Sequence, residues 1–124
     1  MRILNLTSVS VPATATSAQG TATDFSASTA RSPFNQGASA VAVIRAVGAA
    51  SATAHLQVST DGGSTYADAV DDTGAAIAPA FGTAAVQSAS SYFNVKNIGQ
   101  LMRLNVVSSS TAGAGAIQAT LLGN

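Results

Sequence analysis

The chain has 124 residues and few charges: five Lys and Arg balance five Asp, Glu is absent, and 8% of the residues are charged, against about 25% in typical soluble domains. This length fits one domain, and the small, balanced charge excludes both disorder driven by charge and the basic surface of a nucleic-acid-binding protein. Cysteine is absent, which excludes disulfides and thiolate metal sites, and no apolar run approaches the roughly 18 residues that span a membrane.

Ala, Ser and Thr fill the places that charged residues usually occupy. A surface with so little charge is poorly suited to a dilute free monomer, and it suits a protein whose outer faces are covered by copies of itself or by a partner. The composition therefore predicts a protein that assembles.

The N-terminal third contains one clear β-prone run. Residues 2–11 are rich in Ile, Leu, Thr and Val, and a proline ends the run because proline donates no hydrogen bond to a strand ladder. Residues 13–23 are small and polar, which indicates a loop or an arm, and residues 23–29 fit a short strand. We therefore divide the single domain into an N-terminal strand with an extended arm over residues 1–34 and a β-sandwich core over residues 35–124.

Two strand-like runs, residues 40–47 and 52–59, form the centre of the pattern. Over residues 52–59 apolar and polar residues alternate strictly, with His55 on the polar face, which predicts a half-buried strand. Over residues 40–47 both faces are apolar apart from Arg45, which indicates a strand covered on both sides. We expect its second face to meet either the second sheet or another molecule; that face consists of Ala40, Ala42, Ile44 and Ala46.

Three further strands follow a long connection. Residues 67–82 contain three Asp, two Gly and one Pro, which indicates an irregular segment. Residues 90–96, 101–108 and 116–122 alternate as strands do, and in the second of these Arg103 points outward. Seven or eight short strands with no amphipathic helix predict an all-β fold, an antiparallel β-sandwich of jelly-roll or other Greek-key form.

His55 is the only histidine, and it is the natural candidate for a catalytic base. A hydrolytic triad would require a nucleophilic Ser and an Asp beside it, and the chain has no Gly-x-Ser-x-Gly elbow. The polar face of a strand is also an ordinary place for a histidine in contact with solvent or a partner. We therefore expect no enzymatic activity and no cofactor.

Four of the five carboxylates fall within a dozen residues, at Asp61, Asp68, Asp71 and Asp72. Converging loop carboxylates bind hard cations such as Ca²⁺, which makes these four the candidate metal ligands. Their spacing does not match an EF-hand, however, and the Asp61-Gly-Gly-Ser run is also what a tight hairpin turn requires. We favour a solvated acidic loop over a metal site.

From Ala38 onward, about two-thirds of the chain resembles small β-sandwich virion proteins of tailed bacteriophages. In these proteins a strand pair leads into a Ser/Thr-x-Asp-Gly-Gly-x-x-aromatic turn, followed near the end by an aromatic strand, a Leu/Met-Arg-Leu/Val-x-Val strand and a last apolar strand. The turn is matched here by Ser59, Asp61, Gly62, Gly63 and Tyr66, and the later strands by residues 92–95, 101–106 and 117–122.

The resemblance implies a non-enzymatic structural protein, and within that class a head decoration (cement) protein. Such a protein is made in the host cytoplasm and binds the capsid surface of the virion through contacts with the major capsid protein and with itself, as a homotrimer, without nucleic acid or membrane. The alternative is a tail or fibre component with a glycan-binding module, for which Tyr66 or Tyr92 would be required. The candidate interface residues are Leu4, Leu6, Phe34, Ala40, Ala42, Ile44 and Ala46.

Overall fold

The computed structural model describes residues 2–11, 17–24, 40–47, 52–81, 90–96, 101–108 and 115–123. These residues form strands, turns and irregular segments with no helix, and so they contain no helix that could cross a membrane. All strand pairs are antiparallel. The prediction of an all-β fold is confirmed.

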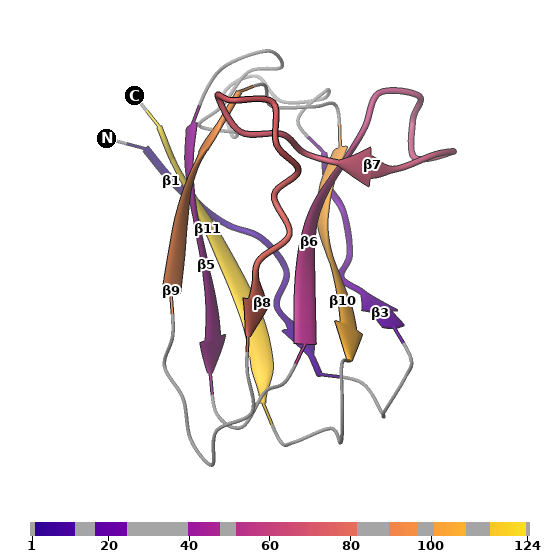
Figure 1. Ribbon diagram of the computed structural model, residues 1–124. Coiled ribbons are helices and arrows are strands. Elements are labelled where there is room, and N and C mark those ends of the chain that lie inside the picture. Colours follow the sequence, from indigo (N-terminus) through magenta and orange to yellow (C-terminus); the bar gives the residue numbers. More distant parts are fainter. Residues whose placement is uncertain are drawn as a thin grey trace.

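The strands form two sheets that lie as two layers (Figure 1). The order in sheet A is β1 (Arg2–Asn5), β11 (Ala116–Gly123), β5 (Ala40–Val47) and β9 (Ser90–Val95), with β2 (Val9–Ser10) also paired to β11. The order in sheet B is β3 (Ser17–Gln19), β10 (Leu101–Ser108), β6 (Ala52–Ser59) and β7 (Ala67–Asp68), with β4 (Thr23–Asp24) paired to β10 and β8 (Ala80–Phe81) paired to β6. The two layers make the β-sandwich that the alternating strands predicted.

The core lies between the sheets and is built from every second residue of each long strand. Ile44 and Ile117 come from sheet A, Leu56 and Leu104 from sheet B, and all four are fully buried. Each large aliphatic side chain of this kind contributes about 1.5–3 kcal/mol relative to its exposed state. The strict alternation in the sequence is therefore the direct cause of the two-layer architecture.

The inner face of β5 corrects one set of interface candidates. Ala42, Ile44 and Ala46 are fully buried and Ala40 is 7% exposed, because this face packs into the core. Of the two alternatives for this face, the second sheet is the one that covers it, so none of these residues is available to a partner of the folded chain. Leu6 is buried in the same core and Leu4 packs against it, whereas Phe34 lies outside the described residues.

The described part of the N-terminal segment belongs to the sandwich. β1 and β2 pair with β11, and β3 and β4 pair with β10, so residues 2–11 and 17–24 extend both sheets rather than forming a separate arm. The run over residues 2–11 is split into two strands by residues 6–8, although the Leu6 N–H still donates to the Ala119 carbonyl at 3.0 Å.

The connection between β7 and β8 is more ordered than its composition suggested. The Ala69 N–H donates to the Leu56 carbonyl at 2.7 Å, and the Leu56 N–H donates to the Ile77 carbonyl at 3.0 Å, while Ile77 itself is fully buried. Further along, the Lys96 N–H donates to the Val70 carbonyl at 3.1 Å. This segment therefore closes one side of the sandwich and links β6 of sheet B to the end of β9 in sheet A.

Candidate functional site

The sandwich presents two outer faces of opposite character, one on each sheet. On sheet A, the pairing register aligns the outward residues of its four main strands in rows that run across the sheet. One row is Ile3, Leu122, Val41 and Asn94; the next is Asn5, Thr120, Val43 and Tyr92. Residues that are paired directly across antiparallel strands project to the same face, so these side chains are neighbours.

Five of these outward residues form what we call the apolar patch: Ile3, Val41, Val43, Tyr92 and Leu122. Ile3 is 61% exposed and Tyr92 is 71% exposed; the other three are half-buried. Only three large apolar side chains are classed as exposed in the described part of the chain, and two of them belong to this patch. A contiguous exposed apolar surface is typical of a site of protein contact.

Arg45 is the one charged side chain among the described outward positions of these strands. It is exposed, lies one row beyond the apolar patch opposite Gln118, and makes no ion pair within the described residues. Arg and Tyr are the side chains most enriched where protein interfaces concentrate their binding energy. Among the described residues, the outer face of sheet A thus combines an apolar centre with a cation, Arg45, that makes no ion pair.

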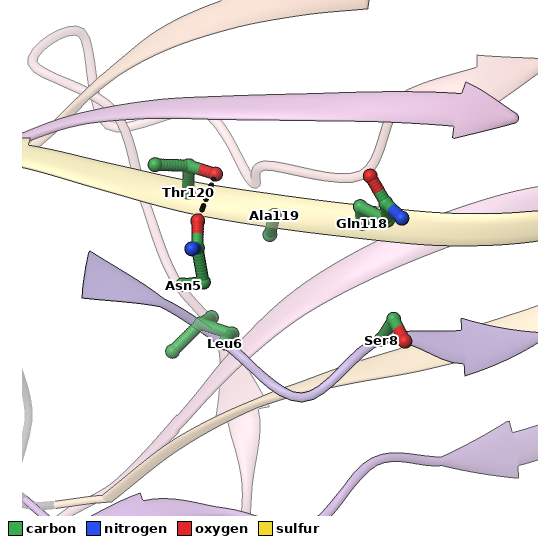
Figure 2. Close-up of a pocket in the computed structure, with 6 residues that line it drawn as sticks. All are labelled: Asn5, Leu6, Ser8, Gln118, Ala119 and Thr120. Carbon is green, nitrogen blue, oxygen red and sulfur yellow. Dashed lines mark hydrogen bonds between the residues drawn. The ribbon is translucent and has the colours of Figure 1, made fainter. Parts of the chain in front are cut away.

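A small pocket of about 260 Å³ lies on the same sheet, where β1 ends and β2 begins (Figure 2). Asn5, Leu6 and Ser8 form one wall and residues 118–120 of β11 form the other, and the Thr120 hydroxyl donates to the Asn5 side-chain oxygen at 2.7 Å. This volume is below the roughly 300 Å³ at which ligand pockets begin, and its most central polar pair is already satisfied. The pocket is a by-product of the break between β1 and β2.

The outer face of sheet B is polar. In one row the Gln19 amide donates to the Asn105 side-chain oxygen at 2.9 Å, Asn105 is paired with His55, and Nδ1 of His55 lies 3.1 and 3.2 Å from the two carboxylate oxygens of Asp68. Because a carboxylate only accepts, Nδ1 carries the proton, and none of the hydrogen bonds among the described residues involves Nε2. The His55 and Asp68 side chains are 27% and 30% exposed, so solvent reaches both.

A second row lies two residues further along the same strands. The Arg103 Nε donates to the Gln57 side-chain oxygen at 3.0 Å, and the Arg103 guanidinium lies 3.7 Å from the centre of the Tyr66 ring. One face of Tyr66 is therefore covered by a cation. We call the two rows together the polar network: Gln19, His55, Gln57, Tyr66, Asp68, Arg103 and Asn105.

Two of the four candidate metal-binding aspartates hold turns together. Asp61 accepts from the Thr65 hydroxyl, the Thr65 N–H and the Ser59 hydroxyl, and these hydrogen bonds lower its pKa from 3.8 to about 2. Asp71 accepts from the Thr73 hydroxyl and from the N–H groups of Thr73 and Ala75, which likewise lowers its pKa. Gly62 and Gly63 adopt positive φ angles of 75° and 94° in the first of these turns. These carboxylates act as backbone caps.

The other two aspartates contact side chains on two different strands. Asp68 pairs with His55, and Asp72 lies 3.4 Å from the side-chain amide nitrogen of Asn94 on β9. No three potential metal ligands come together among the described residues. The four aspartates are therefore close in sequence but act separately in space.

Sequence reasoning placed His55, Arg103 and the neighbouring polar residues on outward faces, and the structure agrees. It did not join them, because the pairing of β6 with β10 and of β7 with β6 is a long-range property. The sequence did contain a signal for the polar network. If the strands at residues 52–59 and 101–108 had been assumed to be neighbours, their predicted outward residues would have lain side by side.

Comparisons with known proteins identified no relative of this chain. A scan against protein-family models, a search of curated proteins and a search of solved structures each found no match. The two outer faces therefore supply the structural basis for proposing a function.

Proposed function

We propose that this chain is a virion structural protein, a decoration protein that binds the assembled head of a tailed bacteriophage through the outer face of sheet A. The observation that carries the proposal is the apolar patch beside Arg45. It is the face on which the described residues expose their largest apolar side chains, in a chain that is otherwise poor in both charge and aromatic residues.

The strand order supports this class of protein. Counting β1 with β2, β3 with β4, and β7 with β8 as single strands, sheet A has the order 1-8-3-6 and sheet B the order 2-7-4-5. Successive long strands alternate between the sheets, as they do in an eight-stranded jelly roll, a fold used by capsid and lectin domains. The order supports the jelly-roll form of the sandwich.

The mechanism follows from mass action. A protein that binds the closed lattice but not free capsid subunits stabilises the lattice by the free energy of its own binding. The apolar patch provides the burial, and Arg45 provides orientation by pairing with a carboxylate of the major capsid protein. A cluster of copies, with a trimer as the expected form, strengthens weak individual contacts through effective concentration.

The test uses purified protein and empty heads of the phage that encodes it. We expect co-sedimentation at saturating stoichiometry and a rise in the temperature at which the heads rupture. Heads that neither retain the protein nor gain thermal stability would contradict the proposal. Free capsid subunits are the control, and they should bind much more weakly than assembled heads.

A further inference from the structure

We infer that the polar network on sheet B is a second binding surface, which recognises a neutral, polyhydroxylated ligand of the carbohydrate class. The inference does not depend on the proposed function, because it concerns the opposite face of the sandwich. It starts from an uneven distribution of residue types. The chain contains one His and two Tyr and has only ten charged residues, yet His55, Tyr66, Asp68 and Arg103 lie together on this face.

The network is organised before any ligand arrives. Its hydrogen bonds span 2.9–3.2 Å and join side chains from β3, β10, β6 and β7. The members are planar groups whose orientation is fixed by their neighbours, so little conformational entropy is lost when they bind something else. Three hydrogen-bonded pairs thus lie side by side on one face and link β3 to β10, β10 to β6 and β6 to β7.

The hydrogen bonds within the network leave a particular set of groups for a ligand. The terminal nitrogens of Arg103 and the amide nitrogens of Gln57 and Asn105 are left as donors, and Nε2 of His55 is left as an acceptor. Rows two residues apart are about 7 Å apart along a strand, and neighbouring strands are about 4.8 Å apart. A face that offers both donors and an acceptor suits a ligand with several hydroxyl groups, because a hydroxyl both donates and accepts.

Charge balance favours a neutral ligand. Arg103 and Asp68 contribute one charge of each sign, so the polar network carries no net charge when His55 is neutral. A ligand without net charge is therefore the better match for this face. A protein partner is disfavoured because this face lacks the apolar centre that stable protein interfaces bury, whereas sheet A has one.

The sequence had named Tyr66 as a residue that a glycan-binding module would require, but the Arg103 guanidinium already covers one face of its ring. Recognition is thus assigned to hydrogen bonds from the planar polar groups, with Tyr66 holding Arg103 in position. Because the two outer faces point away from each other (Figure 1), a chain docked by sheet A leaves this surface open to the medium.

The test is an array of neutral hexose and N-acetylhexosamine oligosaccharides printed beside sialylated and uronic-acid oligosaccharides, followed by titration of the best neutral binder. We expect neutral glycans to bind and Arg103→Ala and Asn105→Ala to weaken binding by about tenfold or more each, the loss expected for about 1.4 kcal/mol of hydrogen bonding. Gln118→Ala, an amide change on the outer face of sheet A, is the matched control and should leave the affinity unchanged.

Three results would overturn the inference: no binding to any glycan, binding confined to acidic glycans, or neutral binding that survives both substitutions in sheet B. Self-association that is lost in Arg103→Ala and Asn105→Ala would assign the face to a second copy of the chain instead. None of these results bears on head binding, so this inference and the proposed function fail separately.

Discussion

Nδ1 of His55 on β6 lies 3.1 Å from the carboxylate of Asp68 on β7, so two residues thirteen positions apart are joined by a hydrogen bond, which is an ion pair only when the imidazole is protonated. This is the base-and-orienter half of a catalytic triad. The described hydrogen bonds of His55 run to Asp68, with no serine hydroxyl among them. The pair joins β6 to β7 on the outer face of sheet B.

A double-mutant cycle on His55→Gln and Asp68→Asn measures this pair directly. Both side chains are more than a quarter exposed, so solvent screens the interaction and the coupling energy should be below about 1 kcal/mol. Urea unfolding of the four proteins gives the value. A coupling of several kcal/mol would show instead that the pair is a principal support of the fold.

Acid should destabilise the protein through its two capped turns. The folded-state pKa of Asp61 is about 2 and that of Asp71 is also lowered, whereas in the unfolded chain both carboxyl groups return towards 3.8. Below about pH 4 the unfolded state takes up protons first, so the stability that these turns contribute above that pH is lost as the pH falls towards 2. Melting temperatures between pH 6 and pH 2 should show the decline.

Asp61→Asn should flatten that acid decline, because the substituted side chain no longer titrates. Asp72→Asn is the control, since its 3.4 Å contact with Asn94 is too long to be a strong hydrogen bond. An acid profile that is the same in wild type and Asp61→Asn would contradict this account of the turn.

Alanine substitutions at the two glycines of the turn after β6 should lower the stability of the protein by different amounts. Gly63 has a φ of +94°, and a Cβ added there would lie 3.2 Å from Cδ1 of Leu101, whereas a Cβ on Gly62, with a φ of +75°, would meet no atom within 4 Å. Both alanine variants incur the left-handed backbone cost of about 1–2 kcal/mol, and Gly63→Ala adds a tight contact. We expect Gly63→Ala to be the less stable of the two by chemical denaturation; equal losses would show that Leu101 simply moves aside.

Adjacent residues of β5 should respond very differently to truncation. Ile44 is fully buried, so Ile44→Ala should cost about 2–5 kcal/mol through lost burial and the cavity left behind. Val43 lies on the half-buried outer face, and Val43→Ala should cost less than about 1 kcal/mol. The reverse order in urea unfolding would mean that the faces of β5 have been exchanged.

The sequence was sufficient to predict the two-sheet architecture because alternation reports directly which face of a strand is buried. Residues 52–57 and 101–108 have their inward and outward residues as expected, whereas at the end of β6 Ser59, expected on the polar face, is buried and Val58 is half-buried. The apolar nature of both faces of β5 was also recognised, but the interface candidates named on it, Ala40, Ala42, Ile44 and Ala46, lie on the face that packs into the core. Alternation along a strand shows which residues share a face. When both faces are apolar, it does not show which of them points into the core.

The short strands and the side-chain contacts between strands were not predicted, because both depend on which strands become neighbours. β3, β7 and β8 are two or three residues long, and such short strands exist because a long neighbour offers free backbone groups, not because of their own sequence. The His55–Asp68 and Arg103–Tyr66 contacts likewise depend on which strands become neighbours. Strand order is set by the packing of the whole chain, which a local pattern does not encode.

The most direct test of the central proposal is to compare head binding by three proteins: wild type, the double variant Val43→Ser/Tyr92→Ser, and Val107→Ser. The double variant removes two members of the apolar patch on sheet A, and Val107→Ser is a matched change on the half-buried outer face of sheet B. With folding checked by circular dichroism, we expect the double variant to lose head binding by at least about a hundredfold, equivalent to about 2.7 kcal/mol, while Val107→Ser binds like wild type. Undiminished binding by the double variant, or loss of binding by Val107→Ser alone, would contradict docking through the outer face of sheet A.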